Sequence, residues 1–181
     1  MKALLDACVL YPTVLRQILI GVAAEGLYRP LWSARILEEW ARATVKLGPG
    51  AEALARGEIA ALAAAWPGAA VAVPAGLEAR LWLPDANDIH VLAAAIAGGA
   101  DRIITFNAAD FPRHLLAEEG ILRQDPDAFL RELWQAAPAR VAARIEAVRA
   151  EAERLSGTAQ PLRALLKRAG LPRLGKALAP G

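Results

Sequence analysis

Carboxylates recur along the chain at places where a buried strand ends or a helix begins. Asp6 interrupts the apolar run of residues 3–12, and a buried, unpaired Asp is costly, so it needs a helix N-terminus, a basic partner or a metal ion. Further acids at comparable places are Glu38, Glu39, Asp85 and Asp88. Hard divalent cations prefer carboxylate oxygens, and two such ions can activate water and stabilise the leaving oxygen in phosphodiester cleavage. A metal-dependent hydrolase is therefore the first hypothesis.

Most of these side chains also have a purely structural interpretation. Asp is among the preferred N-cap residues, so Asp85 or Asp88 could simply cap a helix. Glu38 and Glu39 fit solvated helix positions, and Arg35 on the same helix is expected to be solvated rather than to meet phosphate. Three more side chains are predicted to be structural, namely His90, His114 and Cys8, the last as a small buried hydrophobe.

The cysteine and histidine content limits which metals the chain could hold. With the single Cys8 and two histidines, the sequence offers neither an internal disulfide nor a multi-cysteine or His-rich zinc site. A metal would therefore be held mainly by oxygen, which points to Mg²⁺ or Mn²⁺. No GxxxxGK[ST], GxGxxG or GxSxG motif is present, and this argues against nucleotide-binding loops and serine hydrolases.

The totals describe a globular chain. A length of 181 residues suits one domain of ordinary size, or one domain with an appended subdomain, and 56% of the residues are hydrophobic while 22% are charged. No apolar run reaches the length of a membrane span, and the N-terminus lacks the features of a signal peptide. We therefore expect a soluble, cytoplasmic protein.

Alternating strands and helices should bring the acids together. Strands are predicted at residues 3–5, 27–33, 69–74 and 101–107, with a weaker one within 120–126, and helices at 13–26, 34–48, 51–65, 76–82 and from Asp88 to Gly98. This alternation is typical of an α/β fold with a parallel sheet covered on both faces, and ligands of such sheets bind beyond the carboxyl ends of the strands. Asp6, Thr105 and Asn107 lie at such ends.

The chain changes character in its C-terminal part. From about residue 125 the pattern is helical throughout, with a break at 156–161. Residues 1–139 carry 12 Lys and Arg against 16 Asp and Glu, a net charge of −4, whereas residues 140–181 carry 9 against 3, a net charge of +6. The last stretch is a candidate surface for an acidic partner or nucleic acid, with solvated helix faces as the alternative.

Three segments together resemble the PIN domain, the metal-dependent nuclease fold shared by VapC-type toxins. They are "LLDACVLYP", "WSARILEEW" and "LPDANDIHVLAAAIAGGADRIITFNAADFP", which span about residues 3 to 112 in this order. The resemblance implies a PIN-like three-layer fold with a five-stranded parallel sheet. It also implies an acidic pocket that binds Mg²⁺ or Mn²⁺ and cleaves single-stranded or structured RNA.

The resemblance assigns roles by position in the motifs. The implied catalytic acids are Asp6, Glu39 and Asp88, the implied metal ligands are Asp6, Asp88, Asp85 and Asn107, and the implied supporting residues are Thr105, Asp110 and Glu38. Asn107 is the departure, because many relatives have Asp there, and a second metal site depends on it. By the same resemblance, residues 1–124 form the nuclease domain and residues 125–181 a basic helical C-terminal extension.

Two functions follow from the resemblance, and a third class competes with them. The first is a metal-dependent endoribonuclease, the toxin of a type II toxin–antitoxin pair, with RNA as substrate, a small antitoxin protein as partner and a homodimer left open. The alternative is a catalytically weak PIN domain that binds RNA or protein. A phosphatase of the haloacid dehalogenase type also begins with an Asp after its first strand, but it needs a second Asp where this chain has Cys8.

Overall fold

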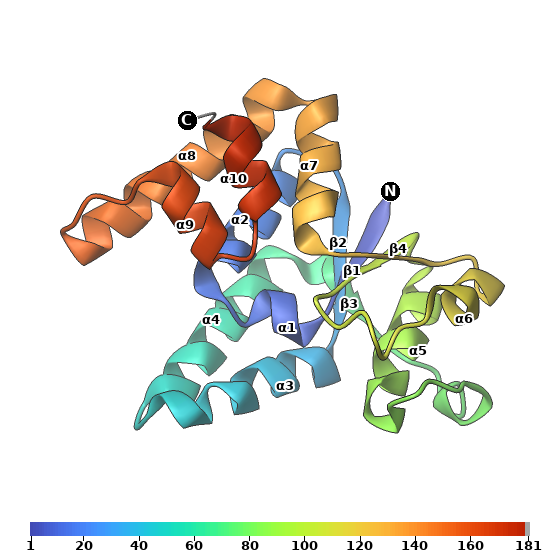
Figure 1. Cartoon of the computed structure of the whole chain (residues 1–181). Helices are drawn as coiled ribbons and strands as arrows, with labels where there is room; N and C mark the ends of the chain where they lie inside the picture. The colour runs from blue at the N-terminus through green and yellow to red at the C-terminus, as the bar shows by residue number, and fades with distance from the viewer. Residues whose placement is uncertain (180–181) are drawn as a thin grey trace. The chain divides into compact units, whose positions relative to one another are not determined.

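A parallel sheet of five strands organises the first of the two units into which the chain divides (Figure 1). The computed structural model describes residues 1–179. The first unit comprises Met1–Tyr11 and Arg29–Gln124, and the second comprises Pro12–Tyr28 and the chain from Asp125 onward. The strands are β1 (Lys2–Leu5), β2 (Arg29–Ser33), β3 (Ala70–Val71), β4 (Arg102–Ile104) and β5 (Leu122–Gln124). The predicted five-stranded parallel sheet is confirmed.

The strand order places a topological switch point beside β1. In the order β3-β2-β1-β4-β5, the chain builds outward from β1 on one side and then returns to add β4 and β5 on the other. The reversal lies between β1 and β4, whose last residues, Leu5 and Ile104, are register partners. Such a switch point is where open α/β sheets bind ligands, at the carboxyl ends of the strands. Asp6 and Thr105 are the next residues along the chain.

Helices and short 3₁₀ turns connect the strands of this unit. The helices are α1 (Ala7–Leu10), α3 (Ala34–Ala43), α4 (Ala51–Ala65), α5 (Ile89–Gly98) and α6 (Arg113–Glu118), and the turns are Val45–Leu47, Pro67–Ala69, Glu78–Arg80 and Ala86–Asp88. The sequence did not predict α1 or α6, which are too short to show a helical period. The helix predicted at 34–48 ends earlier, where the Thr44 hydroxyl donates to the Ala41 carbonyl at 2.6 Å.

Helix α5 packs closely on the sheet because its buried face is made largely of small residues. It contacts β1, β2, β3 and β4, and Ala93, Ala94 and Ala95 are fully buried. At its end, a Cβ on Gly98 would lie 2.9 Å from Leu31 Cδ1 and 3.0 Å from Val71 Cγ2. The next residue, Gly99, ends the helix in the left-handed region with φ +59°. Gly98 thus allows α5 to pack closely on the sheet, and Gly99 ends the helix.

The second unit is helical. Its helices are α2 (Thr13–Ala24), α7 (Pro126–Ala136), α8 (Pro138–Ser156), α9 (Leu162–Arg168) and α10 (Pro172–Leu178). Helix α8 contacts α2 and α7, and α10 contacts α7 and α9. The expected C-terminal helical region is confirmed, and it shares this unit with residues 12–28 from the N-terminal part. The predicted domain division after residue 124 stays a prediction.

A buried carboxylate joins α7 to α10 within the second unit. Asp127 accepts hydrogen bonds from the backbone N–H groups of Arg173 and Leu174 at 2.9 and 2.8 Å, and from Arg173 Nε at 3.0 Å. The Tyr28 ring meets Phe129 edge-on at 5.0 Å. Within residues 1–179, no helix combines the length and the hydropathy that a membrane span requires.

The close approach of α5 to the sheet gives a stability prediction. Gly98→Ala should lower the free energy of unfolding by about 1–3 kcal/mol, because the β-branched Val71 has little freedom to yield to the new methyl group. Gly57→Ala in α4 is the matched control, since its Cβ would meet nothing within 4 Å. That variant should gain up to about 1 kcal/mol from helix propensity. Equal effects of both substitutions in denaturant titrations would contradict this packing argument.

Candidate metal centre

Asp6 lies at the carboxyl end of β1 with its side chain largely buried. The residue is 7% exposed, and its backbone N–H donates to the Ile104 carbonyl at 3.2 Å. Its carboxylate Oδ2 accepts a hydrogen bond from Thr105 Oγ1 at 2.6 Å and one from Cys8 Sγ at 3.2 Å. These two donors partly compensate the burial of the charge. No basic side chain donates to this carboxylate among the hydrogen bonds and ion pairs of the described residues.

Thr105 and Cys8 together join the loop after β1 to the loop after β4. The Thr105 hydroxyl donates to Asp6 and accepts from the Asn107 backbone N–H at 2.9 Å. Cys8 Sγ lies 3.3 Å from the same hydroxyl and accepts from the Phe106 backbone N–H at 3.4 Å. Burial, followed by the charge of Asp6, raises the pKa of the Cys8 thiol to about 12, so the thiol is protonated at neutral pH. No feature of the sequence indicated this contact of Cys8.

Three carboxylates gather beside this junction. Asp85, Asp88 and Asp110 each offer an oxygen, and the three oxygens lie within 4.8 Å of one another. Asp85 caps the short turn before α5 by accepting from the Asn87 backbone N–H at 2.9 Å, and Asp88 accepts from Asn107 Nδ2 at 3.0 Å. The predicted capping role and the predicted place among the acids therefore both hold for Asp85. Asp110, predicted as a supporting residue, lies within this group.

The surrounding charges reach Asp88 from several elements. Burial first, and then the charges of Asp6, Asp85, Asp110 and Glu39 in that order, together raise the pKa of Asp88 to about 6. Like charges that cannot all ionise freely at one place are the mark of a site that favours a cation. The structure thus brings Asp88 within electrostatic reach of the other two predicted catalytic acids.

Glu39 reaches the same region from α3, which Ser33 caps by accepting from the Ile36 backbone N–H at 3.2 Å. Glu39 Oε1 lies 2.7 Å from Nε2 of the buried His90 on α5, and 3.7 Å from Arg35 Nε. The His90 contact is at ion-pair distance without hydrogen-bond alignment, and His90 Nδ1 has no partner within residues 1–179. The sequence predicted a structural role for His90, and its contact with Glu39 was not foreseen.

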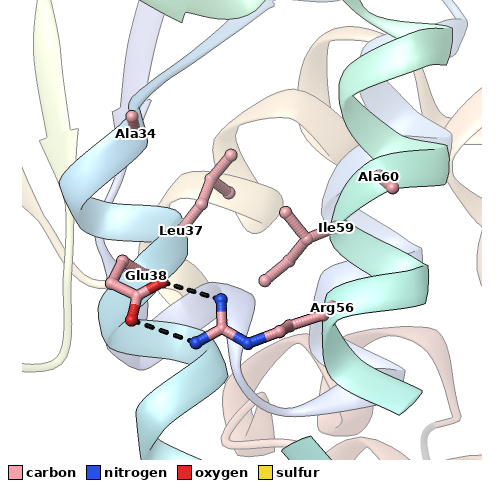
Figure 2. A pocket seen from close by; sticks show the side chains of 6 residues that line it. All are labelled: Ala34, Leu37, Glu38, Arg56, Ile59 and Ala60. Carbon is pink, nitrogen blue, oxygen red and sulfur yellow. Dashed lines mark hydrogen bonds and ion pairs between the residues drawn. The ribbon is translucent and has the colours of Figure 1, made fainter. Parts of the chain in front are cut away.

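Glu38 points away from these acids, toward α4 (Figure 2). Its carboxylate accepts from Arg56 at 2.8 and 3.1 Å and from Arg42 at 2.8 Å. These hydrogen bonds, first those of Arg56 and then those of Arg42, lower the pKa of Glu38 to about 2. The structure does not bring Glu38 together with the other predicted site residues, because adjacent helical positions face different directions.

The donor set of the centre fits a hard divalent cation. Asp85, Asp88 and Asp110 supply grouped carboxylate oxygens, the charge of Asp6 acts on Asp88, and Mg²⁺ and Mn²⁺ favour oxygen ligands of this kind. The nearby Cys8 is a protonated thiol, which is a poor ligand. Asn107 presents its Nδ2 to Asp88, so its predicted role as an oxygen ligand stays a prediction.

Comparison with known proteins divides the chain into two matched segments. A family model described as PIN domain matches residues 2–109, and one described as VapC50 C-terminal domain matches residues 126–180. No curated protein and no solved structure shows significant similarity to the chain. The first segment contains Asp6, Glu39, Asp85 and Asp88, and Asp110 follows directly after its last residue.

The raised pKa of Asp88 predicts a pH-dependent stability. Between its ordinary pKa of 3.8 and the folded value of about 6, the folded chain keeps a proton that the unfolded chain has released. The stabilising contribution of this group is therefore complete below pH 3.8 and is lost as the pH rises through about 6. Asp88→Asn should then melt at a higher temperature than wild type at pH 7–8, with little difference near pH 4.

Melting curves in EDTA between pH 4 and 8 measure this difference. Glu118→Gln, which removes an exposed carboxylate on α6, is the control for loss of a negative charge. If Asp88→Asn follows the wild-type curve at every pH, or falls below it at pH 7–8, the carboxylates do not repel one another as described.

Proposed function

The chain belongs to the PIN-domain family, whose members are generally nucleases, and we propose that it is a metal-dependent endoribonuclease that hydrolyses RNA phosphodiester bonds. One observation carries the proposal. The buried Asp6 and the group of Asp85, Asp88 and Asp110 meet at the switch point of the sheet, with an oxygen donor set suited to Mg²⁺ or Mn²⁺. Hydrolysis of a phosphodiester is the chemistry that such a centre serves best.

The proposed mechanism divides the work among the acids. Asp6, Asp85 and Asp88 would hold a divalent cation, which when bound would supply charge stabilisation at the phosphate and a more acidic water. The Thr105 hydroxyl orients the Asp6 carboxylate through its 2.6 Å hydrogen bond. Glu39, whose Oε1 lies 2.7 Å from His90 Nε2, would act as the general base that takes the proton from the attacking water. Asn107 holds Asp88 in place.

A second candidate function has one specific observation in its favour. Asn107 stands where many relatives have an acid, and its Nδ2 donates to Asp88. Because this amide donates a hydrogen bond to the Asp88 carboxylate, less of the negative charge of that carboxylate is available for a second cation. A PIN domain with weak cleavage that binds RNA or protein would be built in this manner, and metal-dependent cleavage assays separate the two functions.

The match of the C-terminal segment favours a toxin among the PIN nucleases. Residues 126–180 match the VapC50 C-terminal domain, and VapC-like proteins act with an antitoxin. We therefore propose that the chain is the toxin of a type II pair, acts on RNA in the cytoplasm and binds a small antitoxin. A gene for such a protein beside the gene for this chain would support the pairing.

The charge of the C-terminal helices is concentrated on α9 and α10. On α8, Arg140 and Arg144 pair with Glu25, while Arg149 and Arg154 pair with glutamates of α8 itself. Arg163, Lys167 and Lys176 are exposed and have no carboxylate partner among the described residues. We propose that these three cations contact the RNA backbone. An unpaired cation can neutralise a phosphate, and the RNA then releases the counterion that this phosphate had bound.

The first prediction of the proposal concerns RNA cleavage by variants of Asp6 and of the neighbouring residues Glu38 and Glu39. Asp6→Asn and Glu39→Gln should each lower Mg²⁺- or Mn²⁺-dependent RNA cleavage by on the order of 100-fold or more. Glu38→Gln is the matched control and should retain cleavage, because Glu38 faces α4. Mg²⁺ should raise the melting temperature of wild type, and it should raise the melting temperature of Asp6→Asn by a smaller amount. Equal losses in Glu38→Gln and Glu39→Gln would exclude the proposed role of Glu39.

The second prediction concerns the unpaired cations. In an Asp6→Asn background, Arg163→Gln with Lys167→Gln should weaken RNA binding and reduce the slope of log K against log salt by about 1.4, at roughly 0.7 per phosphate contact. Arg140→Gln with Arg154→Gln removes the same charge from paired positions and should change the slope little. Identical slopes for both double variants would reject RNA contact by α9.

A further inference from the structure

Two exposed aromatic side chains stand apart from the other tryptophans and phenylalanines of the chain. The chain has five Trp and three Phe, and six of the eight are buried or partly buried. Trp82 is 66% exposed and Phe106 is 44% exposed. Large aromatic side chains at this exposure keep apolar surface in water that a flat ligand could cover.

Both residues belong to the loops that carry the acids of the metal centre. Phe106 lies between Thr105 and Asn107 in the loop after β4, and Trp82 precedes Asp85 by three residues. The two loops meet, because Asn107 Nδ2 donates to Asp88 at 3.0 Å and an oxygen of Asp110 lies within 4.8 Å of one of Asp85.

The backbone under each ring is held by neighbouring groups. The Phe106 N–H donates to Cys8 Sγ, and the next N–H, that of Asn107, donates to Thr105 Oγ1. Leu83, which is 2% exposed, anchors the chain directly after Trp82 in the core. The backbone that carries each ring is therefore held in place. This lowers the entropic cost of binding a flat ligand, because less of the chain has to be ordered.

We propose that Trp82 and Phe106 bind unpaired nucleobases of the substrate by stacking, next to the phosphate that the metal centre cleaves. This inference rests on the proposed function and narrows the substrate class to single-stranded or loop RNA, since paired bases in a duplex do not offer their faces. Stacking on an aromatic side chain contributes about 5- to 150-fold in affinity per base. Specific RNA recognition commonly uses unstacked bases in this way.

The surroundings of the two rings favour bases over a protein partner. The other exposed large hydrophobic residues of the described chain lie on other segments, namely Met1, Val45, Leu47, Leu54, Leu122 and Leu155. Near the rings the neighbours are acids instead, and the core of a protein interface is depleted of charge. Separate aromatic faces beside a phosphate-cleaving centre match the alternation of base and phosphate along a strand.

Affinity measurements with matched strands test the inference. In the full-length Asp6→Asn chain with Mg²⁺, an unstructured oligoribonucleotide should bind more tightly than a strand of the same length without bases, and more tightly than its duplex. Trp82→Ala or Phe106→Ala should lower affinity for the first strand by about 5- to 150-fold and leave that for the baseless strand unchanged. Trp82→Phe should retain most of the affinity, and Leu155→Ala serves as the control for loss of an exposed apolar side chain.

Three results would overturn base stacking. The first is equal affinity of the unsubstituted rings for the two single strands, and the second is no effect of either Ala variant on affinity. The third is an Ala variant that loses as much affinity for the baseless strand as for the strand with bases. If the Ala variants instead weaken only binding of the antitoxin, the rings form a protein interface. Cleavage of the base-bearing strand by the wild-type chain with Mn²⁺ tests the nuclease function separately from the affinity measurements in the Asp6→Asn chain, so failure of the nuclease function is distinguishable from failure of stacking.

Discussion

The repulsion among carboxylates at the switch point of the sheet is the constraint on which the site depends. The folded chain holds Asp6 nearly out of water. Four acids, namely Asp6, Asp85, Asp110 and Glu39, lie within electrostatic reach of Asp88. Thr105, Cys8 and Asn107 donate to these acids, and none of the three carries a positive charge. The residual excess of negative charge is what a bound divalent cation would neutralise.

Much of this arrangement could be predicted from the sequence because its determinants are local. The apolar run that ends at Asp6 and the run that ends at Thr105 are short strands, and parallel strands end at a shared edge. The PIN-domain resemblance added Glu39 and Asp88 by position. The resemblance favoured Glu39 over Glu38 as the catalytic glutamate; this choice stays a prediction, and the structure directs Glu38 to Arg56.

Other features could not be predicted because they depend on contacts between distant residues. Cys8 accepts from Phe106 and donates to Asp6 only when β1 and β4 are neighbours, and a lone cysteine in an apolar run carries no sign of this. The contact of His90 with Glu39 likewise requires α3 and α5 to lie close together. The net charge of +6 over residues 140–181 overstated the free charge of α8, because pairing with Glu25 is set by the packing of α2 on α8.

The partnership of α2 with α8 has a consequence for synthesis of the chain. Leu15, Ile18, Leu19 and Val22 form the buried face of α2, and the helix that contacts α2 begins at Pro138. On the ribosome, more than a hundred residues are added between these two helices. Throughout that interval the apolar face of α2 lacks its partner, although the strands on either side of it can already pair. A nascent chain of this topology keeps the apolar face of α2 uncovered until α8 has been made, so the rate of translation between the two helices sets how long that face is open to aggregation.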